Sequence, residues 1–287
     1  MTIPAAFEYT RASSVEEALR ILAADDGAKA IAGGQSLLPL MKLRLAQPGR
    51  LVDIGRLAEL RGITKLDDGR LSVGALTTYA ELLDSPAVHL GVIRDAVPAI
   101  ADVQVRNRGT IGGAVAHADP AADLPAALLA LDAEVVVQSA SGTRNASLDG
   151  FFEGPFQTGL GHDELVTAVI LPAPSGDAGS AYASLEQRAS GYPIAGVAAV
   201  LRIGAGGMIE GAGIGVTGVA DHAYRAHEVE AALIGTTGTA EAVAAAAALV
   251  VGDREVNADI HAGRDYRAAM AVVHAKRAIE AALARAR

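Results

Sequence analysis

The amino-acid sequence predicts an α+β protein in which a larger part built of α/β layers precedes a smaller α+β domain. Up to about residue 171, strand-like and helix-like segments alternate and glycines stand at the strand ends, which is typical of α/β layers. The Pro-, Ser- and Gly-containing stretch 172–177 is typical of a domain junction. Three strand-like runs and then three helical runs follow it. We therefore place the two domains at residues 1–176 and 177–287.

The first predicted element is a helix that begins after Ser14, because Ser14 and Glu17 have the spacing of a capping box. Apolar residues then recur at helical spacing, and an Asp-Asp-Gly sequence ends the helix. Thr78 and Glu81 repeat the capping-box spacing before another helix. The remaining elements expected in this domain are strands at 29–32, 52–54, 71–75, 134–138 and 165–171, and helices at 88–101 (interrupted by Pro98) and 124–131.

In the second domain, alternating apolar residues predict strands at 181–187, 196–203 and 208–216. A Gly-rich stretch at 204–207 predicts a hairpin between the last two strands. Helical spacing of the apolar residues follows at about 226–233, 239–251 and 265–287. This order of elements favours a small antiparallel sheet that helices cover on one face.

Composition excludes several classes of protein. The formal net charge of −9 disfavours nucleic-acid binding, which depends on clustered Lys and Arg. The absence of cysteine excludes disulfides, thiolate zinc sites, a thiol nucleophile and iron–sulfur clusters held by this chain. The longest apolar run, 242–251, is about half of the roughly 20 residues that span a bilayer. The start of the chain lacks the apolar segment of a secretory signal, so we expect a soluble, intracellular protein.

Two glycine-rich loops are the first candidate site. Residues 32–37 read Ala-Gly-Gly-Gln-Ser-Leu, and residues 109–114 read Gly-Thr-Ile-Gly-Gly-Ala. Paired glycines let backbone amides approach an anion, and Ser36 and Thr110 add hydroxyl donors beside those amides. Together the loops could grip the diphosphate of a dinucleotide. A single Gly-Gly pair, however, is most often only a tight turn.

Other motifs fail. A literal G-x-G-x-x-G at Gly213, Gly215 and Gly218 lies within a predicted strand, with no helix directly after it, so we interpret these glycines as sites of close sheet packing. There is no Walker lysine, no H-E-x-x-H and no G-x-S-x-G, and the seven histidines lack metal-ligand spacing. We therefore expect no catalytic side chain and no metal ligand in this chain.

Asp123 and Tyr192 each allow two interpretations. Asp123 precedes a helix and could cap it, and as an acidic residue near a dinucleotide it could also accept hydrogen bonds from ribose hydroxyls. Tyr192 lies on a predicted loop between two strands of the second domain. A loop tyrosine is mostly a surface residue, but its ring could stack on a planar heterocycle.

The two loops, followed by the run His117…Asp119-Pro120…Asp123, resemble the medium, FAD-binding subunit of the molybdenum hydroxylases. This group includes the flavoproteins of aerobic carbon monoxide dehydrogenase and xanthine dehydrogenase, and the resemblance covers essentially the whole chain. It implies an FAD-binding fold of the vanillyl-alcohol-oxidase (PCMH) type made of two α/β subdomains, about 1–55 and 56–176. It also implies a carbon monoxide dehydrogenase flavoprotein C-terminal domain with a three-stranded antiparallel sheet and a helical bundle.

The resemblance also implies which residues contact FAD. The two loops would hold the diphosphate, Asp123 would bind ribose, Val166 would lie near adenine, and Tyr192 would lie against the isoalloxazine ring. Valine at Gly33 or Gly112 would then abolish flavin retention by occupying the space of the diphosphate. Where many relatives carry a basic residue, this chain has Glu186, so a cofactor contact at that position is not carried over. The complete set of implied FAD contacts is Ala32, Gly33, Gly34, Gln35, Ser36, Leu37, Thr110, Ile111, Gly112, Gly113, Ala114, Asp123, Val166 and Tyr192.

The implied function is electron transfer within a complex of the carbon monoxide dehydrogenase type. Electrons would pass from a molybdenum cofactor in a large subunit, through two [2Fe-2S] clusters in a small subunit, to FAD in this chain and then to an acceptor such as a quinone. The family implies a dimer of heterotrimers in the cytoplasm, with association to the inner face of the membrane through the acceptor chain. The alternatives are a relative that oxidises a purine, an aldehyde or an N-heterocycle, and a non-redox nucleotide-binding module.

Overall fold

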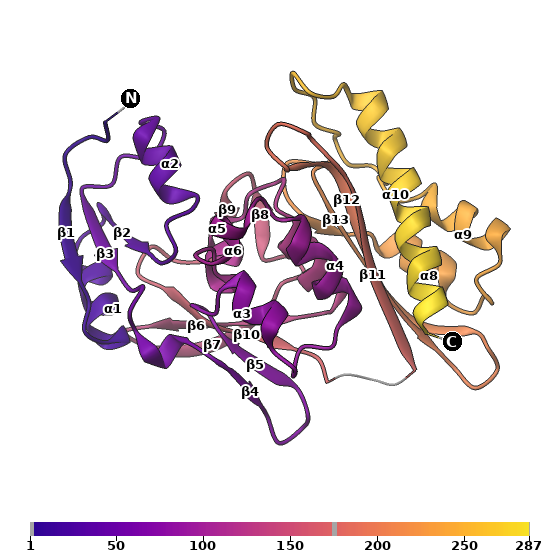
Figure 1. Cartoon of the computed structure of the whole chain (residues 1–287), viewed down its shortest axis with the longest axis horizontal. Coiled ribbons are helices and arrows are strands. Elements are labelled where there is room, and N and C mark those ends of the chain that lie inside the picture. Colours follow the sequence, from indigo (N-terminus) through magenta and orange to yellow (C-terminus); the bar gives the residue numbers. More distant parts are fainter. Residues whose placement is uncertain (1–2, 174–176, 287) are drawn as a thin grey trace.

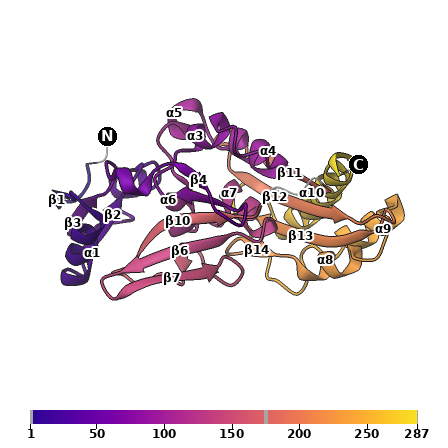
Figure 2. The same ribbon diagram turned by 90° about the horizontal axis from the view of Figure 1, so that it is seen from below.

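The computed structural model describes residues 3–173 and 177–286. Figure 1 shows three parts in chain order: an N-terminal subdomain, a central subdomain and a C-terminal domain. Figure 2, turned by 90°, shows the same arrangement in a row. Residues 174–176, in the middle of the predicted domain junction, lie outside the described residues.

The N-terminal subdomain is a three-stranded parallel sheet with the strand order β1-β3-β2. Helices connect its strands, as parallel pairing requires. Ser14 caps α1 by accepting a hydrogen bond from Glu17 N, but the Glu17 carboxylate accepts from Ser13 N (2.7 Å), so the predicted capping box at Ser14 is only half formed. The elements are β1 (Glu8–Arg11), α1 (Val15–Ala24), β2 (Ala28–Ile31), α2 (Leu37–Lys42) and β3 (Arg50–Asp53).

The central subdomain contains a five-stranded antiparallel sheet, in the order β4-β5-β10-β6-β7, with helices packed on it, and a separate antiparallel pair, β8-β9. The capping box at Thr78 and Glu81 is complete, and Pro98 lies in the last turn of its helix. The strands are β4 (Ile63–Lys65), β5 (Leu71–Gly74), β6 (Glu134–Ser139), β7 (Gly142–Ser147), β8 (Phe152–Gly154), β9 (Gln157–Thr158) and β10 (Leu165–Leu171). The helices are the short 3-10 turn Ala58–Leu60 and α3 (Tyr79–Asp84), α4 (Gly91–Ala99), α5 (Val103–Arg106), α6 (Ile111–His117) and α7 (Asp123–Ala130).

The C-terminal domain is an antiparallel sheet in the order β11-β12-β13-β14. The two-residue strand β14 is an addition to the three strands expected from the sequence, where it is too short to leave a pattern. The elements are β11 (Ala178–Glu186), β12 (Pro193–Ile203), β13 (Ile209–Thr217), β14 (Tyr224–Arg225), α8 (His227–Leu233), α9 (Ala240–Ala247) and α10 (Arg264–Arg285). No helix within the described ranges combines the length and hydropathy that a membrane span requires.

Both faces of the sheet in the C-terminal domain are buried. Along β12, Val197 and Leu201 contribute to a core with the C-terminal helices, whereas Ala198 contributes to the core of the central subdomain. Helices α4 and α7 contact one side of the sheet and α10 contacts the other. Figure 1 shows α4 and α10 on opposite sides, and α7 is labelled in Figure 2. The two domains therefore share a packed interface, with α7 sandwiched between the sheets.

The glycines of the rejected G-x-G-x-x-G motif allow this contact. A Cβ atom on Gly213 would lie 2.1 Å from the carbonyl oxygen of Ala130, and one on Gly215 would lie 1.9 Å from that of Ala126. Both oxygens belong to α7, which packs on β13. The interpretation of these glycines as sites of close packing is confirmed.

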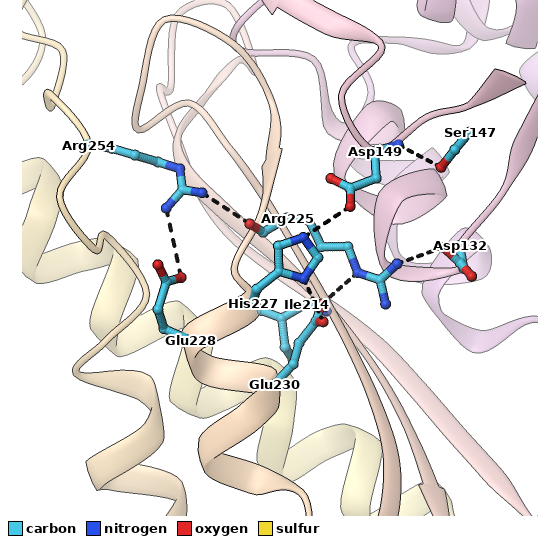
Figure 3. Close-up of polar contacts among 9 residues, drawn as sticks. All are labelled: Asp132, Ser147, Asp149, Ile214, Arg225, His227, Glu228, Glu230 and Arg254. Carbon is cyan, nitrogen blue, oxygen red and sulfur yellow. Dashed lines mark hydrogen bonds and ion pairs between the residues drawn. The ribbon is translucent and has the colours of Figure 1, made fainter.

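A polar network joins the two domains beyond the C-terminal end of α7 (Figure 3). Arg225 pairs with Asp132 of the central subdomain at 2.6 Å and with Glu230 of its own domain at 2.7 Å. His227 lies between Asp149 of the central subdomain (3.0 Å) and Glu230 (3.2 Å). Glu230 is buried, and its carboxylate is compensated by these side chains and by a backbone amide of β13.

Candidate functional site

A cavity of about 460 Å³ opens between the N-terminal subdomain, the central subdomain and one loop of the C-terminal domain. Every implied FAD contact lines this cavity except Ile111, whose side chain is fully buried. The structure therefore brings together residues that lie up to about 160 positions apart in the sequence, from Ala32 to Tyr192. Pockets of this size, with mainly apolar walls and a few polar groups, are typical of cofactor sites.

The first glycine loop offers unpaired hydrogen-bond donors. Among the described residues, no acceptor pairs with the backbone amides of residues 33 to 36. Ser36 stands at the N-terminus of α2, yet its hydroxyl makes no capping bond. Gly34 has φ = +74°, a conformation that turns the chain sharply and favours glycine. Consecutive free amides next to a hydroxyl can bind an anion such as a phosphate.

The second glycine loop has its amides already engaged. Ile111 N donates to Thr77 O at 3.0 Å, and Gly112 N donates to Ala75 O at 2.9 Å. Thr110 is the N-cap of α6, and its hydroxyl oxygen accepts from Gly113 N at 3.1 Å. The hydroxyl hydrogen of Thr110 remains available as a donor on the cavity wall.

The glycines of the two loops face protein rather than open space. A Cβ atom on Gly33 would lie 1.9 Å from Arg108 O, and one on Gly112 would lie 2.4 Å from the Cβ of Ala75. The sequence-based reason for expecting flavin loss in valine variants was therefore wrong. The added side chain would collide with the protein itself, so these variants test folding before they test cofactor binding.

Asp123 begins α7, but the N-cap position belongs to Ala122, and no side chain caps this helix. The interpretation of Asp123 as a helix cap is therefore wrong. Its Oδ1 instead accepts a hydrogen bond of 2.7 Å from the hydroxyl of Tyr182 in β11. Burial raises the pKa of the Asp123 carboxyl to about 7, and the bond from Tyr182 opposes that rise. Asp123 also lines the cavity, where an ionised carboxylate could accept hydrogen bonds from hydroxyl groups.

Val166 and Tyr192 line the cavity from opposite domains. Val166 lies in β10 beside a shift in the register of that strand against β6. Tyr192 is 47 % exposed on the loop between β11 and β12, where its carbonyl oxygen accepts from Gln187 N at 2.8 Å. The partly exposed ring of Tyr192 therefore forms a part of the cavity wall that comes from the C-terminal domain.

Several cavity residues were not among the predicted contacts. Tyr79 is buried at the start of α3, and burial raises the pKa of its hydroxyl. The rings of His117 and Phe156 lie 5.0 Å apart, and burial lowers the pKa of His117. His117 and Asp119 belong to the run on which the resemblance depends, so the sequence carried a signal for them. Tyr79 lies within the Thr78–Glu81 capping box, which predicts a helix and not a cavity, and Phe156 belongs to no motif, so only the fold brings them to the cavity.

Two family models match the chain. The model described as FAD binding domain in molybdopterin dehydrogenase matches residues 5–174, and that of the CO dehydrogenase flavoprotein C-terminal domain matches residues 180–282. The chain is 41 % identical over 286 residues to the carbon monoxide dehydrogenase medium chain of Hydrogenophaga pseudoflava, covering 99 % of both chains.

Another similar protein is named for a different substrate. The glyceraldehyde dehydrogenase medium chain of Sulfolobus acidocaldarius is 42 % identical over 234 residues, which is 81 % of this chain and 82 % of that one. Among solved structures, carbon monoxide dehydrogenase from Hydrogenophaga pseudoflava matches with a TM-score of 0.95 and 42 % identity, covering 99 % of each chain.

Proposed function

Because this chain belongs to the family of FAD-binding medium subunits of the molybdenum hydroxylases, we propose that it binds FAD in the cavity and transfers electrons through it. The observation that carries this proposal is the row of unpaired amides at residues 33 to 36 in a cavity that Thr110 and Asp123 also line. Those donors suit a diphosphate, and the carboxylate suits ribose hydroxyls. The residues present therefore fit the cofactor.

The two loops would contribute different numbers of hydrogen-bond donors to the diphosphate. The amides of the first loop and the Ser36 hydroxyl would donate directly to phosphate oxygens. From the second loop, the Thr110 hydroxyl would donate, while Gly112 lets α6 pack closely on Ala75 and Gly113 leaves room for the Thr110 hydroxyl. Ile111 would contribute only indirectly, because its buried side chain anchors α6.

The rest of the cofactor would extend to both sides of the diphosphate. Asp123 would accept hydrogen bonds from ribose, the backbone at Val166 would lie against the adenine, and the ring of Tyr192 would pack on the isoalloxazine. Bound FAD supplies the redox chemistry, and the chain binds and orients it. Because the chain has no cysteine, iron–sulfur clusters would have to belong to partner chains.

The proposed assembly contains a large molybdenum subunit and a small subunit with [2Fe-2S] clusters, arranged as a dimer of heterotrimers. This chain would accept electrons from the small subunit and pass them to an external acceptor such as a quinone, in the cytoplasm at the inner face of the membrane. The high similarity to a carbon monoxide dehydrogenase medium chain over nearly the full length supports the carbon monoxide dehydrogenase type.

Cofactor extraction tests the binding proposal. The complex is purified, denatured, and its released nucleotide is separated by chromatography. FAD in about equal amount to this chain, with a flavin spectrum that bleaches when the substrate is added, supports the proposal. AMP or ADP in place of FAD would instead identify a non-redox nucleotide-binding module and overturn it.

A second candidate function keeps the FAD role but changes the substrate of the complex. The relative named for glyceraldehyde dehydrogenase is as similar in identity as the one named for carbon monoxide dehydrogenase, although over a shorter length. A panel of carbon monoxide, aldehydes, purines and N-heterocycles, assayed on the whole complex with a dye acceptor, separates the two. Oxidation of an aldehyde and not of carbon monoxide would favour the second candidate.

A further inference from the structure

The acidic segment from Asp119 to Asp123 is held by the C-terminal domain and not only by its own subdomain. The Thr217 hydroxyl at the end of β13 donates to the carbonyl oxygens of Pro120 (3.0 Å) and Ala122 (2.8 Å). The amide of Gly218 donates to the same Pro120 oxygen at 2.8 Å. The backbone that leads to Asp123 is therefore fixed across the domain interface, next to the cavity.

The hydrogen bond between Tyr182 and Asp123 adds a side-chain contact to this attachment, and a glycine on the neighbouring strand leaves room for the tyrosine hydroxyl. Both side chains are buried, and the Tyr182 hydroxyl lies 2.7 Å from Asp123 Oδ1. On the neighbouring strand, a Cβ atom at Gly196 would lie 2.1 Å from that hydroxyl. The backbone amide of Tyr182 donates to Asp95 of α4 at 3.1 Å, so the strand around the tyrosine is also fixed.

We propose that Tyr182 is a positioning residue for the cofactor: its hydroxyl holds one oxygen of the Asp123 carboxylate so that the other is presented to a ribose hydroxyl. This inference rests on the proposed FAD site. A carboxylate has two oxygens that accept separate donors, so the bond from Tyr182 leaves capacity for a ligand. A side chain fixed before binding loses less conformational freedom when the ligand arrives, which strengthens binding.

The same hydrogen bond controls when Asp123 is charged. Tyr182 stabilises the ionised carboxylate, whereas burial and the nearby carboxylates of Glu186 and Asp119 favour the neutral form, and the net pKa is about 7. Besides burial, the charge of Asp123 also raises the pKa of Tyr79 and of Tyr192, and Ser184 forms a side-chain hydrogen bond with Tyr182. Removing the Tyr182 hydroxyl should therefore raise the pKa of Asp123 further. FAD binding that needs the carboxylate would then weaken at a higher pH than in the wild type.

The test is Tyr182→Phe in the full chain, with FAD affinity titrated by flavin fluorescence from acidic to mildly alkaline pH. We expect binding about tenfold weaker at neutral pH, as for a hydrogen bond to a charged group, and a pH midpoint shifted upward. The matched control is Tyr224→Phe, because the Tyr224 hydroxyl is also buried but donates to Val250 O (3.0 Å) inside the C-terminal domain. The control should bind FAD like the wild type.

A second variant keeps the test decisive if Tyr182→Phe does not fold. Asp123→Asn retains an oxygen for Tyr182 but cannot ionise, so its weaker FAD binding should no longer change with pH near neutrality. In the double variant, Tyr182→Phe should add little to the loss caused by Asp123→Asn. Folded Tyr182→Phe with wild-type affinity and pH profile, or Asp123→Asn with the wild-type pH profile, would overturn the inference. A wild-type chain that binds no FAD would instead overturn the proposed function.

Discussion

The two glycine loops resemble each other in sequence but differ in how they use their backbone. Each contains a Gly-Gly pair with a hydroxyl residue two positions away, and each leads into a short helix. In the first loop, the amides of residues 33 to 36 have no acceptor among the described residues. In the second, the amides of residues 111 to 114 all donate to protein oxygens. Equivalent motifs can therefore serve as a ligand-binding element in one place and a scaffold in another.

The difference in free amides follows from the segments that each loop contacts in the fold. The first loop follows the end of parallel strand β2, and at Gly33 its backbone packs closely on the carbonyl group of Arg108, just before the second loop. The second loop is paired with the chain after β5, where Thr78 and Thr110 form an isolated bridge. Pairing with that segment consumes the amides of Ile111 and Gly112. A loop that anchors a helix to a sheet has fewer donors left for a ligand.

The largest expected effect is that of Gly112→Val, which tests the scaffold role of the second loop. The new Cβ would lie 2.4 Å from the Cβ and 2.8 Å from the Cα of Ala75, which is closer than non-bonded carbon atoms approach. We expect a loss of at least about 3 kcal/mol in the free energy of unfolding, or no folded protein. Chemical denaturation measures it. Gly206→Val is the control, because nothing lies within 4 Å of a Cβ at that position.

A stable Gly112→Val protein that had lost only FAD would contradict this expectation. It would mean that the valine meets the cofactor and not Ala75, and it would make the two loops equivalent.

An intermediate effect is expected for Thr110→Val, which removes the cap of α6 and the one hydroxyl donor of the second loop. Loss of an N-cap costs about 1 kcal/mol of stability, and loss of the hydroxyl should weaken FAD binding about fivefold. Thr239→Val is the matched control, since Thr239 caps α9 by the same bond, to Ala242 N (3.3 Å), away from the cavity. Denaturation and FAD titration of both variants separate the two roles. Equal FAD affinity in both variants would remove Thr110 from the binding site.

The smallest effect on stability is expected for Ser36→Ala in the first loop. Because the Ser36 hydroxyl makes no capping bond, the free energy of unfolding should change by less than about 0.5 kcal/mol. FAD affinity should nevertheless fall about fivefold through the lost phosphate contact. Parallel melting and FAD titration measure the two quantities. A destabilised variant with unchanged affinity would reverse the roles assigned to the two loops.

Much of the local structure could be predicted from the sequence. Strand β10 has the predicted bounds, Leu165–Leu171, because a continuous apolar run closed by a proline is a strong local signal. The capping box at Thr78 is also complete, because its two residues lie three positions apart and the signal is again local. At Glu17 and Asp123, by contrast, the side chain bonds to a residue that the predicted capping pattern does not contain. The Glu17 carboxylate binds Ser13, and Asp123 binds Tyr182 from another domain.

The sequence by itself determined the elements, the two loops and the residue types that suit a dinucleotide, because capping, turn formation and apolar periodicity depend on neighbours along the chain. Only the tertiary structure decided which amides stay free, that Gly33 and Gly112 face protein, and that Tyr79 and Phe156 reach the cavity. It also decided that Tyr182 holds Asp123 from 59 residues away. Whether a donor is free or paired depends on atoms brought together by folding, and no local pattern records them.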